Sequence, residues 1–141
     1  MERGSRATSL ILVVDDDRDS REALRDFLQI CGYPVRTASN GAEALEFLAT
    51  SEAALILTDI HMPIMDGREL VTRIRQSPRC CHLRIAILTG KDSPLAGYET
   101  LDRFAKPIDS ERLLEFVRSS VGPPVSRNRE KFSAGNDRNP P

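Results

Sequence analysis

Acidic side chains follow two apolar segments of this chain, where they could bind a metal ion or attack a phosphoryl group. Asp15 and Asp16 come directly after the apolar run at residues 10–14, and Asp59 comes after the run at residues 53–58. Carboxylate oxygens are the ligands that hard divalent cations prefer. Carboxylates also serve as nucleophiles toward phosphoryl groups. These residue types therefore point to phosphate chemistry assisted by a cation such as Mg²⁺.

Two further polar residues follow later apolar segments and would complete such a site. Thr89 ends the run at residues 83–89, and Lys106 follows the short run at residues 103–105. A threonine hydroxyl can donate to a phosphoryl oxygen, and a lysine ammonium can pair with a carboxylate or with a phosphate. Phosphoryl transfer depends mainly on positioning and charge neutralisation of this kind.

Each of these residues also has an ordinary structural interpretation. Residues 15–17 alone could cap a helix, Lys106 alone would be a solvated lysine, and Asp66-Gly67 is interpreted as a turn and helix start. Met62 and Met65 are interpreted as packing residues. The functional interpretation is favoured because acids, a threonine and a lysine together stand at the ends of four apolar runs.

The elements that position these residues alternate between strands and helices. The short, uniformly apolar run at residues 10–14 predicts a strand buried on both faces. Further strands are predicted at residues 33–38, where the pattern is weaker, and at residues 54–58, 83–89 and 103–105. Apolar residues at helical spacing predict helices that begin after Asp17 or Asp19, after Asn40 in a capping box with Glu43, after Asp66, and after Asp109. Pro94 and Gly97 leave residues 90–102 ambiguous.

This alternation predicts an α/β fold, with a parallel sheet covered by helices on both faces. Residues 9–121 form the predicted domain. We expect residues 1–8 to be a flexible N-terminus and residues 122–141, which lack apolar periodicity, to be a disordered tail.

Composition argues against several classes of partner. The net charge of −1 over 141 residues favours neither nucleic acid nor an acidic membrane surface, and no apolar run approaches the ~20 residues of a membrane helix. The three cysteines are an odd number without CxxC spacing, so ordinary reduced thiols are expected. The sequence predicts a cytoplasmic protein.

Taken together, four motifs resemble the receiver domain of two-component response regulators. They are Val13-Val14-Asp15-Asp16-Asp17, the loop Asp59-x-x-Met-Pro-x-Met-Asp-Gly, Leu88-Thr89-Gly90, and Lys106-Pro107. The resemblance covers residues 9–121 in family order. It implies a doubly wound, five-stranded parallel sheet of flavodoxin-like order 2-1-3-4-5. Between Thr89 and Lys106 the chain is shorter than is usual in the family, by roughly one helical turn, so a shortened fourth-helix region is expected.

The resemblance also implies roles for individual residues. Asp59 would be the phosphoacceptor. It would take the phosphoryl group from a histidine of a sensor kinase or of a histidine phosphotransfer protein. Asp16 and Asp59 would hold Mg²⁺ through their side chains and His61 through its backbone carbonyl. Asp15 would orient metal-bound water or bind the ion more loosely.

Thr89 and Lys106 would contact the phosphoryl oxygens, and the Lys106–Pro107 bond would be cis. Three residues before this lysine the family often has an aromatic switch residue, where this chain has Arg103. Phe104 is interpreted as a core residue rather than as its replacement. We hypothesise that His61 and Lys91 influence how long the phosphoryl group stays on Asp59. The alternative, given equal weight, is that both are ordinary solvated side chains.

We therefore predict a stand-alone receiver that signals through contact with an unidentified downstream protein or through onward phosphorelay, and not an enzyme with a separate substrate. One alternative is a binding module with the receiver fold that signals without phosphorylation. A remote alternative is a haloacid-dehalogenase-like phosphatase, suggested by Asp15-x-Asp17. That alternative lacks a cap region and a late acidic pair, and it leaves residues 59–67 unexplained.

Overall fold

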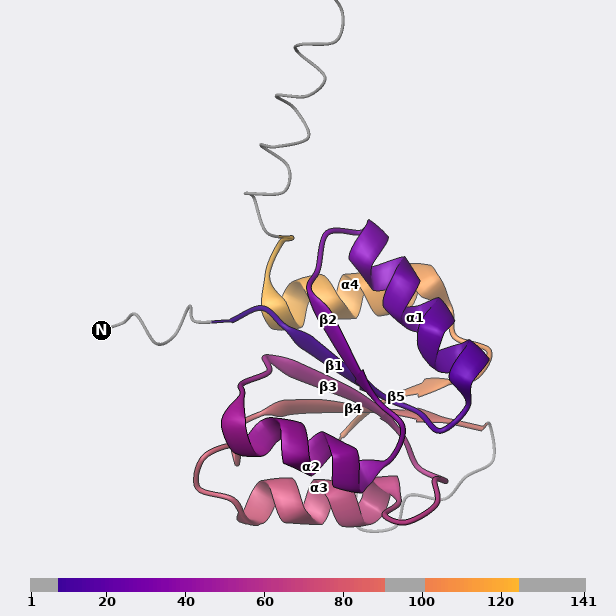
Figure 1. The fold of residues 1–141 in the computed structure, drawn as a ribbon. Coiled ribbons are helices and arrows are strands. Elements are labelled where there is room, and N and C mark those ends of the chain that lie inside the picture. Colours follow the sequence, from indigo (N-terminus) through magenta and orange to yellow (C-terminus); the bar gives the residue numbers. More distant parts are fainter. Residues whose placement is uncertain (1–7, 91–100, 125–141) are drawn as a thin grey trace, which may run out of the picture.

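The computed structural model describes residues 8–90 and 101–124. Five parallel strands form one sheet in the order β2-β1-β3-β4-β5, which confirms the predicted topology (Figure 1). The strands are β1 (Ile11–Val14), β2 (Val35–Ala38), β3 (Leu55–Asp59), β4 (Arg84–Thr89) and β5 (Asp102–Ala105). They match the five predicted runs to within about two residues at either end.

Helices cover both faces of this sheet. Helices α1 (Arg18–Ile30) and α4 (Ser110–Val121) lie on one face, and α2 (Gly41–Thr50) and α3 (Gly67–Gln76) lie on the other (Figure 1). Side chains of β1 alternate between the two layers: Leu12 and Val14 join the core under α2 and α3, whereas Ile11 and Val13 join the core under α1 and α4. The predicted shortened fourth-helix region falls on residues 91–100, outside the described residues.

Four acid or amide side chains begin the helices, as the sequence predicted. Asp17, Asn40, Asp66 and Asp109 are the N-caps, and each side chain accepts from a backbone amide in the first turn. Asp17 rather than Asp19 caps α1. In α2 the Glu43 carboxylate accepts from the Ser39 amide at 2.8 Å, one residue earlier than the standard capping box has it.

The end of α4 is tied to the turn between α1 and β2. The Tyr33 hydroxyl donates to the Gly122 carbonyl at 2.7 Å, and burial raises the pKa of this phenol. A Cβ on Gly32 would lie 2.6 Å from Cβ of Pro124, so a side chain at position 32 would collide with the chain that follows α4. Residues 1–7 and 125–141, which include most of the predicted flexible termini, lie outside the described residues.

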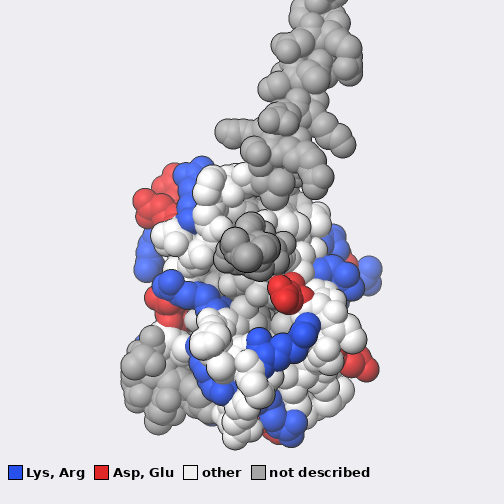
Figure 2. All heavy atoms as spheres, turned by 90° about the vertical axis from the view of Figure 1, so that its left-hand side faces the viewer, with Lys and Arg blue, Asp and Glu red and all other residues white. Residues whose placement is uncertain are grey.

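Charges of both signs occupy the face at the amino-terminal edge of the sheet. Figure 2 shows Lys and Arg side chains there interspersed with Asp and Glu rather than gathered by sign.

In residues 8–90 and 101–124, no helix is both long and apolar enough to cross a bilayer. All three cysteines are free thiols.

Candidate functional site

Strand register brings the predicted site residues to the carboxyl edge of the sheet. Pairing of β1 with β3 places Asp15 level with Asp59, and pairing of β3 with β4 places Thr89 one position beyond Asp59. The Lys106 backbone amide donates to the Thr89 carbonyl at 2.8 Å, which continues the β4–β5 ladder by one residue. Since all strands are parallel, their four ends meet at one edge.

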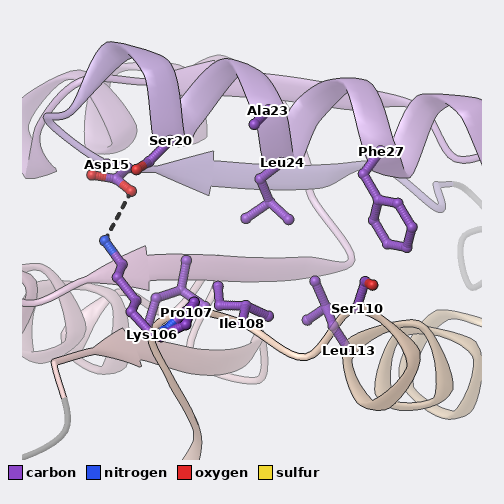
Figure 3. A pocket seen from close by; sticks show the side chains of 11 residues that line it. Asp15, Ser20, Ala23, Leu24, Phe27, Lys106, Pro107, Ile108, Ser110 and Leu113 are labelled. Atoms are coloured by element: carbon purple, nitrogen blue, oxygen red, sulfur yellow. Dashed lines mark hydrogen bonds and ion pairs between the residues drawn. The ribbon is translucent and has the colours of Figure 1, made fainter.

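Lys106 joins two of the acids. Its Nζ lies 3.2 Å from Oδ2 of Asp15 and 3.3 Å from Oδ2 of Asp59. Figure 3 shows the lysine side chain rising from the end of β5 toward Asp15, beside a cavity of about 340 Å³ between α1 and the start of α4. Burial alone would lower the pKa of Lys106, but the carboxylates of Asp59 and Asp15 outweigh it and raise that pKa. The Lys106 side chain is therefore protonated and positively charged at neutral pH.

Asp59 is a largely buried carboxylate with a hydrogen-bond partner for each oxygen. Its side chain is only 14% exposed. One oxygen accepts from the Ile60 amide at 2.7 Å, and the other accepts from Lys106. Burial raises the pKa of Asp59, and the charge of Asp15 raises it further, although Lys106 and the Ile60 amide act in the opposite direction. The net result is a pKa above the usual value for aspartate, so ionisation of Asp59 costs more in the folded chain than in the unfolded one.

Three carboxylates form a set that fits a hard divalent cation. Asp15, Asp16 and Asp59 each offer an oxygen, and these oxygens lie within 4.8 Å of one another. That span is close to twice the Mg²⁺–oxygen distance of about 2.1 Å. Asp15 is buried and Asp16 is exposed, so the set opens to solvent on the side of Asp16. Only oxygen donors are present in this set, which suits Mg²⁺ or Mn²⁺ and not a thiophilic ion.

The remaining predicted residues surround this set. Thr89 is buried at the end of β4, and its hydroxyl donates to the Gly90 carbonyl at 3.0 Å. His61 lies in the loop after β3 with an exposed side chain. The Lys106–Pro107 peptide bond is cis, as the resemblance implied. Lys91 lies outside the described residues.

Two residues support the site in ways that the sequence did not indicate. The Arg21 Nη1 donates to the Asp15 carbonyl at 2.9 Å and so holds the turn that carries the first two acids. A Cβ on Gly67 would lie 2.3 Å from the Asp59 carbonyl oxygen, so only glycine allows α3 to begin this close to the strand end. Arg21 gave no local signal, since its partner is set by the angle of α1 against β1.

Phe104 is a core residue, as the sequence analysis favoured. It is 5% exposed, its ring meets the edge of the Phe116 ring at 5.2 Å between centroids, and Arg112 stacks over it at 5.5 Å. Arg103, at the position of the usual aromatic switch, is exposed. Strand β5 therefore carries its aromatic ring on the core side and a guanidinium on the outer side.

Comparison with known proteins agrees with this geometry. A family model for the response regulator receiver domain matches residues 11–118. Response regulator MprA of Mycobacterium ulcerans is 40% identical over 114 residues, which are 77% of this chain and 48% of that protein. MprA of Mycobacterium avium is 39% identical with 77% and 49% covered. The chain thus spans about half the length of the curated relatives it matches.

Solved structures of lower sequence identity share the fold. Chemotaxis protein CheY4 of Vibrio cholerae has a TM-score of 0.73 and 30% identity, with 80% of this chain and 98% of that chain covered. Response regulator TrrA of Thermotoga maritima, solved in complex with Mg²⁺-BeF, has a TM-score of 0.69 and 34% identity, with 78% and 96% covered.

Proposed function

This chain belongs to the family of response regulator receiver domains, and on that premise we propose that it is a signalling switch phosphorylated on Asp59. One observation carries the proposal: four charged side chains converge at the carboxyl edge of the sheet, namely Asp15, Asp16, Asp59 and Lys106. The Asp59 carboxylate contacts the Lys106 ammonium there. The donor would be a phosphorylated histidine of a sensor kinase or a phosphotransfer protein.

In the transfer step a carboxylate oxygen of Asp59 attacks phosphorus. The new P–O bond gives an acyl phosphate, and the P–N bond to the donor breaks. The electron pair returns to the imidazole nitrogen of the donor, which takes up a proton from solvent. Lys106 lies within reach of Asp59 and would pair with the oxygens of the transferred group. Thr89 would turn its hydroxyl from the Gly90 carbonyl to another of those oxygens.

A divalent cation would be held by Asp16 and Asp59, with Asp15 and the His61 carbonyl as the further ligands that the family resemblance implies. When bound, Mg²⁺ neutralises the carboxylates and the incoming phosphoryl oxygens. The oxygen-only donor set supports this assignment, and the related TrrA was solved with Mg²⁺. Self-catalysed transfer and hydrolysis on Asp59 would be the only chemistry, without a separate substrate.

Signalling would follow from a shift between two conformers. The phosphoryl group adds negative charge at the strand edge, which favours a conformer with Thr89 and Lys106 drawn toward it. A coupling of about 1–3 kcal/mol suffices for regulation. We propose that the output is contact with another protein or onward phosphorelay, within the cytoplasm. Action without an attached output domain stays a prediction from the sequence.

Phosphorylation by a small donor tests the proposal directly. Incubation with acetyl phosphate and Mg²⁺ should add the mass of one phosphoryl group to the intact chain, and peptide mapping should place it on Asp59. Chelation of Mg²⁺ should suppress the adduct, because the carboxylates would then repel the incoming phosphate. No adduct with Mg²⁺ would favour the phosphate-independent binding module instead. Sustained phosphate-ester turnover that depends on Asp15 would favour the phosphatase.

Replacement of Lys106 by methionine should slow this reaction about a hundredfold, the typical effect of removing one preorganised charge donor. Without the ammonium, the buried Asp15 also loses its cationic partner, so the unfolding temperature in chelator should fall. Lys106→Arg keeps the charge but not the compact shape, and should restore stability more fully than rate. Equal rates for Lys106→Met and wild type would contradict the assigned role.

A further inference from the structure

Ile64 combines an unusual backbone conformation with almost complete exposure. Its φ is +70°, and the Met65 amide donates to the Pro63 carbonyl at 2.7 Å across it. This is a γ-turn of the positive-φ kind, which is rare and strained. A β-branched residue is the least suited to such a position, where glycine or asparagine would relax the backbone. In residues 8–90 and 101–124, Ile64 is the only non-glycine residue with positive φ.

The isoleucine side chain does little within the described residues to offset this strain. Ile64 is 81% exposed, so its side chain gains little from packing within the described chain. Strain of this kind persists where the surroundings enforce it, and it is concentrated at functional sites. An isoleucine that contributes so little to the folded domain therefore calls for a role in contact with something else.

The surroundings hold the turn firmly. On one side Met62 is buried in the core under α2 and α3. On the other side the Met65 carbonyl accepts from the Gly41 amide at 3.0 Å, and the Met65 side chain packs so tightly on Gly41 that a Cβ there would lie 2.8 Å from it. The turn therefore projects Ile64 outward as a fixed apolar group.

The position of the turn indicates what this group contacts. Ile64 stands five residues after Asp59, in the loop that leaves the same strand end. A protein that donates a phosphoryl group must bring its histidine to the Asp59 carboxylate, so its surface must cover the loops around that carboxylate. A preorganised apolar anchor in such a loop binds at little cost in conformational entropy.

We propose that Ile64 is a docking residue for the protein phosphodonor, and that it inserts into an apolar patch beside the donor's phosphohistidine. This inference rests on the proposed phosphorylation of Asp59. It assigns to Ile64 recognition of the donor protein and no part in the transfer chemistry. Small donors such as acetyl phosphate have no surface that reaches Ile64.

The test compares two donors across matched variants. The sensor kinases of the source organism are purified as their cytoplasmic portions, and the one that phosphorylates the wild-type chain fastest serves as the protein donor. Ile64→Asn should lower the transfer rate from that kinase roughly tenfold, while the rate with acetyl phosphate stays within about twofold of wild type. Ile64→Leu, which keeps an apolar group without the β-branch, should restore most of the kinase rate.

Ile30 supplies the control, because it is 85% exposed at the end of α1 in ordinary helical backbone. Ile30→Asn should leave the transfer rates with both donors unchanged. Ile64→Asn should also raise the unfolding temperature by about 4 °C, because it relieves the backbone strain. If Ile64 served to stabilise the folded domain, the unfolding temperature would fall instead.

Several results would overturn the inference: an unchanged kinase rate in Ile64→Asn, an equal fall with both donors, an equal fall in Ile30→Asn, or no kinase that phosphorylates a wild-type chain competent with acetyl phosphate. Failure of acetyl phosphate to label wild type would instead reject the phosphorylation itself.

Discussion

Asp59→Asn is expected to abolish the phosphoryl adduct and, in metal-free buffer, to make the domain more stable. The adduct should fall at least a hundredfold, since the amide is not a nucleophile toward phosphate. The stability gain follows from burial, which raises the pKa of Asp59 and so disfavours its ionised form in the folded state. At pH 7 in chelator we therefore expect a higher free energy of unfolding for Asp59→Asn than for wild type.

The sign of this gain sets its pH dependence. A carboxylate whose pKa is raised on folding stabilises the folded state below the unfolded-state pKa of about 4, and loses that contribution as pH rises through the folded-state value. The difference between Asp59→Asn and wild type should therefore be largest near neutral pH and vanish below about pH 4. Chemical denaturation at a series of pH values in chelator measures it.

Asp16→Asn is the matched control for this prediction. Asp16 belongs to the same set of carboxylates but is exposed, so its neutralisation should change the metal-free stability little. Both variants should lose most of the stabilisation that Mg²⁺ confers on wild type. A lower metal-free stability of Asp59→Asn at pH 7, or an adduct that survives in it, would contradict the assignment of Asp59.

Gly67→Ala is expected to have the largest effect on folding of any single methyl group added to the site. The new Cβ would lie 2.3 Å from the Asp59 carbonyl oxygen and 2.8 Å from Cα of Ile60, both of them backbone atoms. The same glycine donates its amide to the Ile60 carbonyl at 2.7 Å, so α3 cannot retreat without breaking that bond. We expect a loss of about 3 kcal/mol, the upper range for overpacking.

This loss should appear as a fall in unfolding temperature of about 12 °C or more. Any folded fraction should also accept phosphate poorly, because relief of the clash displaces the backbone of Asp59. Gly90→Ala is the control. Among the described residues, no atom lies within 4 Å of a Cβ at position 90, so its stability should stay within about 0.5 kcal/mol of wild type. Similar unfolding temperatures for Gly67→Ala and wild type would show that the contact is not restrictive.

Local chemistry explains what could be predicted from sequence. A helix cap needs only a side chain and an amide two or three residues later, so Asn40, Asp66 and Asp109 could be recognised from spacing alone, and Asp17 as one of two candidates. Strands buried on both faces are uniformly apolar, and this pattern located the strand ends and the acids that follow them. The largest displacement of a strand boundary is at β2, which starts at Val35 rather than at residue 33. The Tyr33 amide donates to the Leu28 carbonyl at the end of α1 instead of joining the sheet.

Contacts between distant segments became apparent only in the folded structure. The α/β alternation, the residue types at the strand ends and, through the motifs, the family follow from the sequence. The fold determined that Lys106 bridges Asp15 and Asp59 and that Arg21 holds the Asp15 carbonyl. It also determined that Gly67 and Ile64 shape the loop after Asp59. The physical reason is range: caps and strand patterns arise within a few residues, whereas these contacts depend on how elements far apart in the chain are set against one another.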